Sequence, residues 1–204
     1  MPLPRRSTFV ILCGCMALLG ACTSGPAGVE KPAPSSKQVL EYLDEQSGAT
    51  VTAIEKPLLF ARDRSERAAN LRDYVTMTAA TVNRGGKRDC LLIAYIWSTL
   101  DARYEPARPL ADSLILVADD RRIQLDAKGG TPADYGIVRA VGAPTGRTVK
   151  PLVFPTDLDT LRYIAAARTL QVQATVADEV QSYMLWDDQR KALDRFVRYL
   201  NGQL

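Results

Sequence analysis

The chain has 204 residues, enough for one domain with a sizeable hydrophobic core. Its formal net charge is +3, and Arg5 and Arg6 supply two of those charges. From Cys22 onward the chain carries 24 basic and 23 acidic residues, and this balance argues against a nucleic-acid partner, which needs clustered excess cations. The chain contains no histidine, so Ser-His-Asp catalysis, Cys-His catalysis and the usual zinc sites are excluded.

The first 21 residues have the pattern of a secretory signal peptide. Arg5 and Arg6 precede an apolar run over residues 9–19, and no acidic residue occurs before Glu30. The run is shorter than the roughly 20 apolar residues that a transmembrane helix needs. We therefore expect residues 1–21 to be removed. General secretion is the expected route, because the residues after Arg6 fit the twin-arginine pattern poorly.

The run ends in Leu19-Gly20-Ala21-Cys22, an aliphatic residue and two small residues before a cysteine. This motif resembles the lipobox of bacterial lipoprotein precursors. The resemblance implies that the Cys22 thiol receives diacylglycerol, that a peptidase cuts before Cys22, and that the new amine is acylated. Two or more acyl chains anchor a protein stably to a membrane, whereas one chain binds only marginally. The alternative is an ordinary cleaved signal with Cys22 as a structural thiol.

The lipobox resemblance also implies a location. In enteric-type lipoproteins an aspartate after the cysteine resembles an inner-membrane retention signal, and Thr23 stands there instead. We therefore expect a cell-envelope protein on the outer membrane, facing the periplasm. The body of the chain is similar to small Gram-negative envelope lipoproteins without an assigned function, so no functional residues carry over.

Three segments are expected: a signal peptide at 1–21, a lipid anchor and disordered tether at 22–36, and one domain at 37–204. Residues 23–36 are small, polar and proline-rich and cannot bury apolar surface. Cys90 is the one cysteine left after cleavage and lipidation, and its apolar neighbours predict a buried core thiol.

The domain is expected to begin with an amphipathic helix over residues 38–46, with Val39, Leu40 and Leu43 on one face. Short strands follow at 50–54 and 58–61. Strands at 73–83 and 89–99, joined by a glycine-rich turn at 84–87, predict a long hairpin. The second of these strands is apolar on both faces, which is typical of the centre of a sheet covered on both sides.

A second hairpin is expected at 114–126, turning at Asp119-Asp120. A loop without periodicity spans 127–148. Further strands are expected at 149–154, 169–176 and 183–186, with a helix between the first two and a last helix after Asp188. Together these elements predict an α+β fold, a mainly antiparallel β-sandwich-like domain with about three short flanking helices.

Acidic pairs are the natural candidates for catalysis in a chain without histidine. The pairs lie at a predicted turn or at helix starts, where carboxylates satisfy backbone amides, so structural roles are expected for Asp119, Asp120, Asp157, Asp159, Asp187 and Asp188. Glu41, Asp44 and Glu45 are expected on the solvated face of the first helix. The sequence contains no nucleophile elbow, P-loop or dinucleotide fingerprint. No catalytic residue, cofactor or metal site is therefore assigned.

Aromatic residues on the predicted strands are expected in the core rather than on a binding surface: Tyr74, Tyr95, Trp97, Tyr183 and Trp186. The loop at 127–148 is the exception, because aromatic and arginine side chains are enriched at interfaces. Tyr135, Arg139 and Arg147 are its candidate binding residues.

The favoured hypothesis is a non-enzymatic, lipid-anchored envelope protein that binds another protein as an accessory subunit of an assembly; its oligomeric state is left open. An exposed apolar patch would favour it. A small-molecule or lipid carrier, which needs an interior cavity, is the first alternative. A carboxylate-based hydrolase, which needs two carboxyl groups across a cleft, is the second.

Overall fold

The computed structural model describes residues 39–100, 110–176 and 179–202. The expected signal peptide, Cys22 and the tether lie outside the described residues. Within the described ranges, no helix is both long and apolar enough to cross a bilayer.

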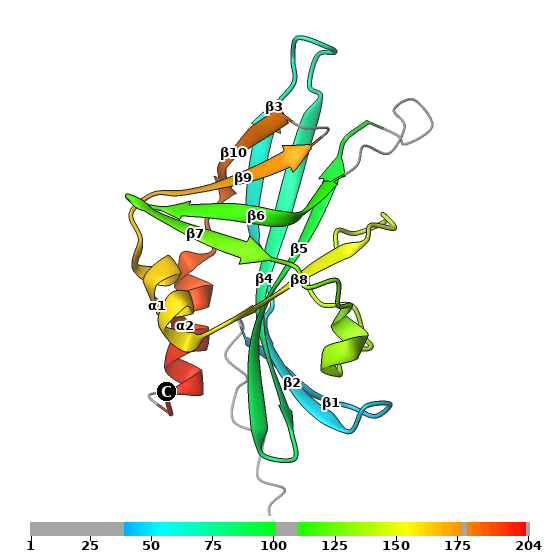
Figure 1. The fold of residues 1–204 in the computed structure, drawn as a ribbon, viewed down its shortest axis with the longest axis vertical. Helices are drawn as coiled ribbons and strands as arrows, with labels where there is room; N and C mark the ends of the chain where they lie inside the picture. Colours follow the sequence, from blue (N-terminus) through cyan, green and yellow to red (C-terminus); the bar gives the residue numbers. More distant parts are fainter. Residues whose placement is uncertain (1–38, 101–109, 177–178, 203–204) are drawn as a thin grey trace, which may run out of the picture. The chain divides into compact units, whose positions relative to one another are not determined.

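The described domain is built mainly from antiparallel strands (Figure 1). In chain order the strands and helices are β1 (Val39–Asp44), β2 (Ala49–Ile54), β3 (Leu58–Asp63), β4 (Arg72–Arg84), β5 (Lys87–Ser98), β6 (Leu110–Ala118), β7 (Arg121–Asp126), the 3-10 helix η1 (Pro132–Tyr135), β8 (Pro151–Thr156), α1 (Leu158–Ala166), β9 (Leu170–Val176), β10 (Glu179–Asp187) and α2 (Arg190–Leu200).

All ten described strands belong to one open sheet in the order β1-β2-β4-β3-β10-β9-β6-β7, with β5 on the second edge of β4 and β8 beyond β5. One edge of β4 is shared: β3 pairs with its first half, from Arg72 to Met77, and β2 pairs with residues 80–83. Because β4 pairs with both β2 and β3, the β1–β2 hairpin and the strands β3-β10-β9-β6-β7 belong to one continuous sheet. The expected sandwich of two sheets is therefore not confirmed, whereas the mainly antiparallel α+β character is.

The long β4–β5 hairpin is the centre of the domain, as the sequence predicted. Its strands pair from Asp73–Ser98 to Arg84–Lys87, and the turn places Gly85 and Gly86 at positive φ. Both faces of β5 are buried, because alternate side chains enter two different hydrophobic clusters. This explains why the sequence of β5 lacks a polar face.

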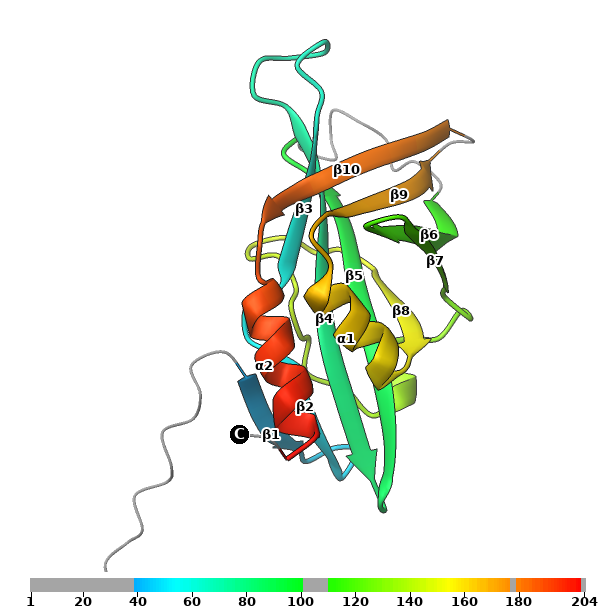
Figure 2. The same cartoon turned by 90° about the vertical axis from the view of Figure 1, so that its left-hand side faces the viewer.

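The larger cluster lies between the inner faces of β3–β10 and the two helices, which run side by side along one face of the hairpin (Figure 2). Asp157 caps α1 by accepting a 2.6 Å hydrogen bond from the Thr160 amide. The buried stripe of α2 contains Ala192, Leu193, Phe196 and Val197, the periodicity that predicted this helix.

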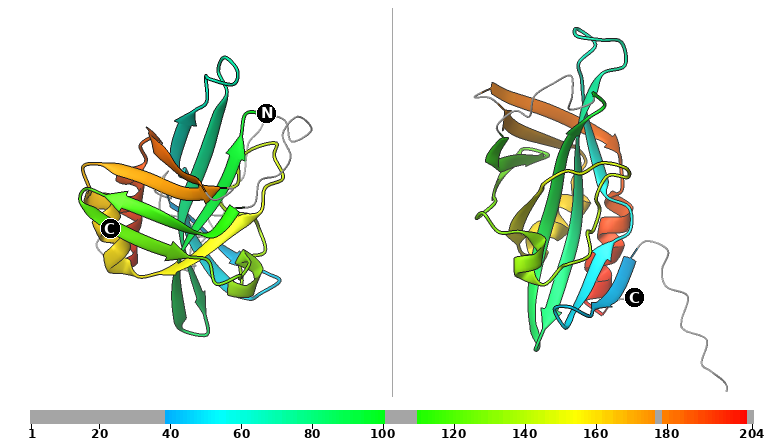
Figure 3. Two further views of the ribbon diagram at one scale, coloured as in Figure 1. Left: turned by 45° about the horizontal axis from the view of Figure 1, so that its top comes forward. Right: turned by 90° about the vertical axis from the view of Figure 1, so that its right-hand side faces the viewer.

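The smaller cluster lies on the opposite face of the hairpin. Side chains of β2, β4, β5 and β8 meet Ile137 and Val141 there, two buried residues of the segment between β7 and β8. Figure 3 shows this segment crossing the face of the hairpin that the helices leave open. The predicted loop at 127–148 is therefore a cover for the second cluster.

The helix expected at 38–46 is wrong, because residues 39–44 form strand β1, which pairs with β2 from Val39–Ile54 to Asp44–Ala49. Leu40 and Leu43, placed on the buried stripe of that helix, are exposed. The nine-residue stretch 38–46 fits both the 3.6-residue period of a helix and the two-residue period of a strand, and its pairing with β2 selects the strand. The described residues therefore hold two α-helices and one short 3-10 helix, rather than about three flanking helices.

Candidate functional site

The β7–β8 segment is attached to the hairpin by polar contacts. Ser47 Oγ donates to the Gly136 carbonyl at 2.7 Å, and Tyr95 Oη donates to the Val141 carbonyl at 3.0 Å. Burial is the main reason that the pKa of the Tyr95 hydroxyl is raised. Each contact satisfies a backbone carbonyl that the segment would otherwise leave unpaired.

Asp44 is the main polar anchor of this segment. Its Oδ1 accepts from the Gln46 and Ser47 amides, and its Oδ2 accepts from the Val138 amide at 2.9 Å and the Arg139 amide at 3.4 Å. The bond from Val138 first, and then those from Ser47 and Arg139, lower the pKa of the Asp44 carboxyl. The expected place of Asp44 on a solvated helix face is therefore wrong, because the residue is buried.

The closest backbone approach in this contact is at Gly142. A Cβ atom there would lie 1.7 Å from Thr78 Oγ1 and 2.7 Å from Thr78 Cβ, and the φ of Gly142 is +67°. Thr78 Oγ1 is buried without a hydrogen-bond partner among the described residues. Glycine is thus required at residue 142 both for its conformation and for its size.

The three loop residues expected to bind a partner lie in different places. Tyr135 is half-buried against the smaller cluster, and the guanidinium of Arg139 lies 5.5 Å from the Tyr42 ring centroid, so both contact the chain's own surface. Arg147 is exposed, with its guanidinium 5.1 Å from the Trp97 ring centroid. Arg147 is the one of the three beside a solvent-exposed aromatic surface.

That surface is a row of side chains across four strands. The pairing registers place Met184 of β10, Ala61 of β3, Tyr74 of β4 and Trp97 of β5 side by side on one face. Trp186 extends the row along β10, where a register shift follows Leu185. We call Tyr74, Trp97, Met184 and Trp186, together with Arg72 and Arg147, the aromatic face.

The rings of the aromatic face are held in place. Tyr74 and Trp97 stack with centroids 4.4 Å apart, and Trp97 Nε1 donates to Thr76 Oγ1 at 2.8 Å. The guanidinium of Arg72 lies 4.6 Å from the Trp186 ring centroid. Met184 is nevertheless 60% exposed and Trp186 57% exposed. A large apolar surface is therefore fixed in shape and open to solvent.

The sequence assigned all five of these strand aromatics to the core, and this is right for Tyr95 and Tyr183, which are buried. It is wrong for Trp186, which lies on the solvent side of β10. Alternation along β10 separates its two faces, but only the pairing with β3 shows which face the core covers. The signal that sequence reasoning missed is the alternation of Val180, Met184 and Trp186 with Gln181 and Tyr183.

Most of the acidic residues have the structural roles expected of them. Asp119 Oδ1 accepts from the Arg168 and Thr169 amides, and these bonds, with that of Thr169 first, lower the pKa of the Asp119 carboxyl. Asp188 pairs with Arg190, which lowers the pKa of the Asp188 carboxyl. Within the described ranges, no group of three or more acidic or cysteine side chains is placed to hold a metal ion.

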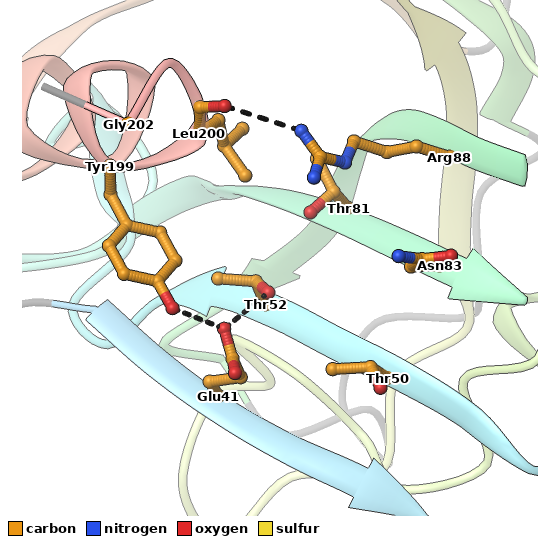
Figure 4. Close-up of a pocket in the computed structure, with 9 residues that line it drawn as sticks. All are labelled: Glu41, Thr50, Thr52, Thr81, Asn83, Arg88, Tyr199, Leu200 and Gly202. Carbon is orange, nitrogen blue, oxygen red and sulfur yellow. Dashed lines mark hydrogen bonds between the residues drawn. The ribbon is translucent and has the colours of Figure 1, made fainter. Parts of the chain in front are cut away.

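A polar pocket of about 500 Å³ lies between β1, β2, β4, β5 and the end of α2 (Figure 4). Two rows of paired residues form its floor: Glu41–Thr52–Thr81 and Thr50–Asn83–Arg88. Tyr199, Leu200 and Gly202 close it from above. Glu41 is the one carboxylate among these lining residues, so the pair that the hydrolase alternative needs is not found in this pocket.

The walls of the pocket are tied together by three hydrogen bonds. Glu41 Oε2 accepts from Tyr199 Oη at 2.5 Å and from Thr52 Oγ1 at 3.2 Å, and Arg88 donates to the Leu200 carbonyl at 3.3 Å. The bond to Glu41 raises the pKa of the Tyr199 hydroxyl. These bonds fix the last turn of α2 over the sheet.

Cys90 lies next to this pocket in the register, paired with Thr81. It is half-buried against the larger cluster, and burial raises the pKa of its thiol. A raised thiol pKa disfavours the nucleophilic thiolate. Cys90 therefore packs against the core, but it is half-buried rather than the fully buried thiol that was expected.

No protein-family model, curated protein or solved structure matches this chain. The function must therefore be argued from the aromatic face, the polar pocket and the sequence.

Proposed function

We propose that this chain is a lipid-anchored, non-enzymatic protein of a bacterial cell envelope that binds another protein through the aromatic face. The observation that carries the proposal is the row Met184–Ala61–Tyr74–Trp97, extended by Trp186. Tryptophan, tyrosine, methionine and arginine are the residues enriched at the centres of protein interfaces. The lipobox motif supports the anchor.

The chemistry of the face specifies the partner. Arg147 has no carboxylate partner within the described residues, whereas Arg72 has a 3.9 Å pair with Asp63, so Arg147 is the unpaired charge of the face. A partner segment with apolar side chains flanked by carboxylates would cover the rings and pair with Arg147.

A membrane surface is the less favoured occupant of the same face. Recognition of anionic lipid takes clusters of about four to eight basic residues, worth about 1 kcal/mol each. The aromatic face has two arginines, and one of them is paired with Asp63. The stacked rings add fixed shape, which a protein partner can match and a fluid bilayer cannot.

Site-specific photo-cross-linking in living cells tests the partner proposal. A photoreactive amino acid at Met184 should capture one protein, and the same group at Gln124, exposed on β7, should not. Trp186→Ala should lower the yield at least tenfold, because truncating a central interface aromatic costs about 2 kcal/mol or more. Leu43→Ala, which removes an equally exposed apolar side chain on β1, is the matched control and should leave the yield unchanged.

Two results would contradict the partner proposal. Equal capture from Met184 and Gln124 would show that the aromatic face has no special role. Capture of lipid from Met184 without any protein would assign the face to the membrane instead.

The anchor is tested separately with Cys22→Ser. We expect the variant to receive no lipid and either to remain uncleaved or to enter the soluble fraction. Membrane fractionation and the mass of the N-terminal peptide provide the measurement. A variant of mature mass that still sediments with membranes would refute the lipid anchor, and the partner proposal would then be tested on the soluble form.

A further inference from the structure

We infer that the polar pocket between α2 and β1–β2–β4–β5 is a carbohydrate-binding site. This inference does not depend on the partner proposal, because none of the pocket's lining residues belongs to the aromatic face. Its volume of about 500 Å³ falls within the range of small-molecule sites, roughly 300–1,000 Å³.

The floor of the pocket contains hydrogen-bonding groups that the protein does not use. Thr81 is only 3% exposed and lines the pocket, yet its hydroxyl has no hydrogen bond within the described residues. The half-buried Thr50 and the exposed Asn83 also line the pocket, and neither side chain is hydrogen-bonded to another described residue. Thr78 Oγ1 is the one fully buried polar side-chain atom without a partner among the described residues, so the Thr81 hydroxyl opens into the pocket. It can there both donate a hydrogen bond to a ligand and accept one from it.

The charges of the pocket indicate a neutral ligand. Glu41 and Arg88 stand at opposite ends of the two rows of the floor, one negative and one positive, with threonine and asparagine between them. Each charged group is already hydrogen-bonded to α2, through Tyr199 and the Leu200 carbonyl respectively. A net charge on the ligand would meet one attractive and one repulsive end, whereas neutral hydroxyls can bond to both ends.

The roof of the pocket supplies an apolar surface. Tyr199 and Leu200 lie above the polar floor (Figure 4), and the Tyr199 ring is partly exposed. A sugar ring has hydroxyls around its edge and C–H groups on its faces. It can therefore bond to the threonines, Asn83 and the charged ends while its C–H face packs against Tyr199.

Ligand-observed NMR and calorimetry on the full chain test this inference, with a detergent that has no sugar headgroup. The probes are glucose, galactose, N-acetylglucosamine and its β1,4-linked dimer, with dialanine as a zwitterion of similar size. We expect saturation transfer to at least one sugar and none to dialanine. Thr81→Val should weaken the Kd about five- to tenfold, the loss of one hydrogen bond, and Thr81→Ser should keep the affinity.

Thr175→Val, on the outer face of β9, is the matched control and should leave the Kd unchanged. Absence of binding of every sugar at about 10 mM would overturn the inference. Tighter binding of dialanine than of any sugar would overturn it as well, since the ends of the pocket would then act as charge receptors. Equal affinity of Thr81→Val and the parent chain would place the sugar elsewhere.

Discussion

At the scale of single residues, Gly142 and Asp44 determine how the β7–β8 segment is held. Gly142 allows the backbone to pass over Thr78, and the Asp44 carboxylate accepts two amides from the segment and two from its own turn. Neither role could be read from the sequence, because each depends on a contact between residues more than 60 positions apart. Residues close in sequence, such as the Asp119 turn and the Asp157 cap, were predicted well.

Gly142→Ala should destabilise the domain by about 2–4 kcal/mol, because the new methyl overlaps Thr78 and the backbone is at positive φ. Gly146→Ala is the control that separates these causes: its φ is +71°, but a Cβ there meets nothing within 4 Å. This control should cost about 1 kcal/mol. Urea unfolding provides the free energies, and equal losses for both variants would show that the Thr78 contact does not exist.

Asp44→Asn should lower the stability at pH 7 and lose its effect in acid. The native pKa of Asp44 is lowered, so the carboxylate stabilises the fold above its unfolded pKa of about 3.9. That stability is lost as the pH falls through the native pKa. Urea unfolding from pH 7 to pH 3 should therefore show a shrinking difference between variant and parent. Glu45→Gln, exposed in the same turn, should show no difference, and a gap that stays constant with pH would contradict the account.

At the scale of elements, turn chemistry and strict alternation made the hairpins predictable. The short stretch 38–46 was mispredicted, because its apolar residues fit either a helix or a strand. Gly85-Gly86 and Asp119-Asp120 marked two turns correctly. Strand β10 is longer than the predicted 183–186, because residues 179–182 also pair with β9 although three of these four residues are polar. The aromatic face was missed for a related reason: it is built by register between strands, and a single sequence does not give register.

The contrast between β1 and α2 yields an element-scale prediction. Phe196→Ala should cost about 3–5 kcal/mol, because Phe196 is buried in the larger cluster and collapse around the cavity is incomplete. Leu43→Ala should change the stability by less than about 0.5 kcal/mol, because Leu43 is 62% exposed on a strand. A large loss for Leu43→Ala would support the amphipathic helix that the sequence first suggested.

At the scale of the whole domain, the two hydrophobic clusters share β4 and β5 but differ in what covers them. The larger cluster is enclosed by strands and two helices, whereas the smaller one is covered by a segment that contributes two buried side chains, Ile137 and Val141. We therefore expect the segment to open without unfolding of the hairpin, since local openings occur where few apolar contacts are buried.

Amide hydrogen exchange can separate this local opening from global unfolding. In the parent chain, amides of residues 136–142 should exchange faster than those of the paired strands β4 and β5. Asp44→Asn should accelerate exchange at residues 136–142 about tenfold or more, because two amides lose their carboxylate acceptor. The exchange rates of amides in β4 and β5 should rise only by the factor that corresponds to the loss of global stability measured by urea unfolding. Equal acceleration everywhere would mean that the segment and the hairpin unfold as one unit, and the smaller cluster would then be as integral to the fold as the larger one.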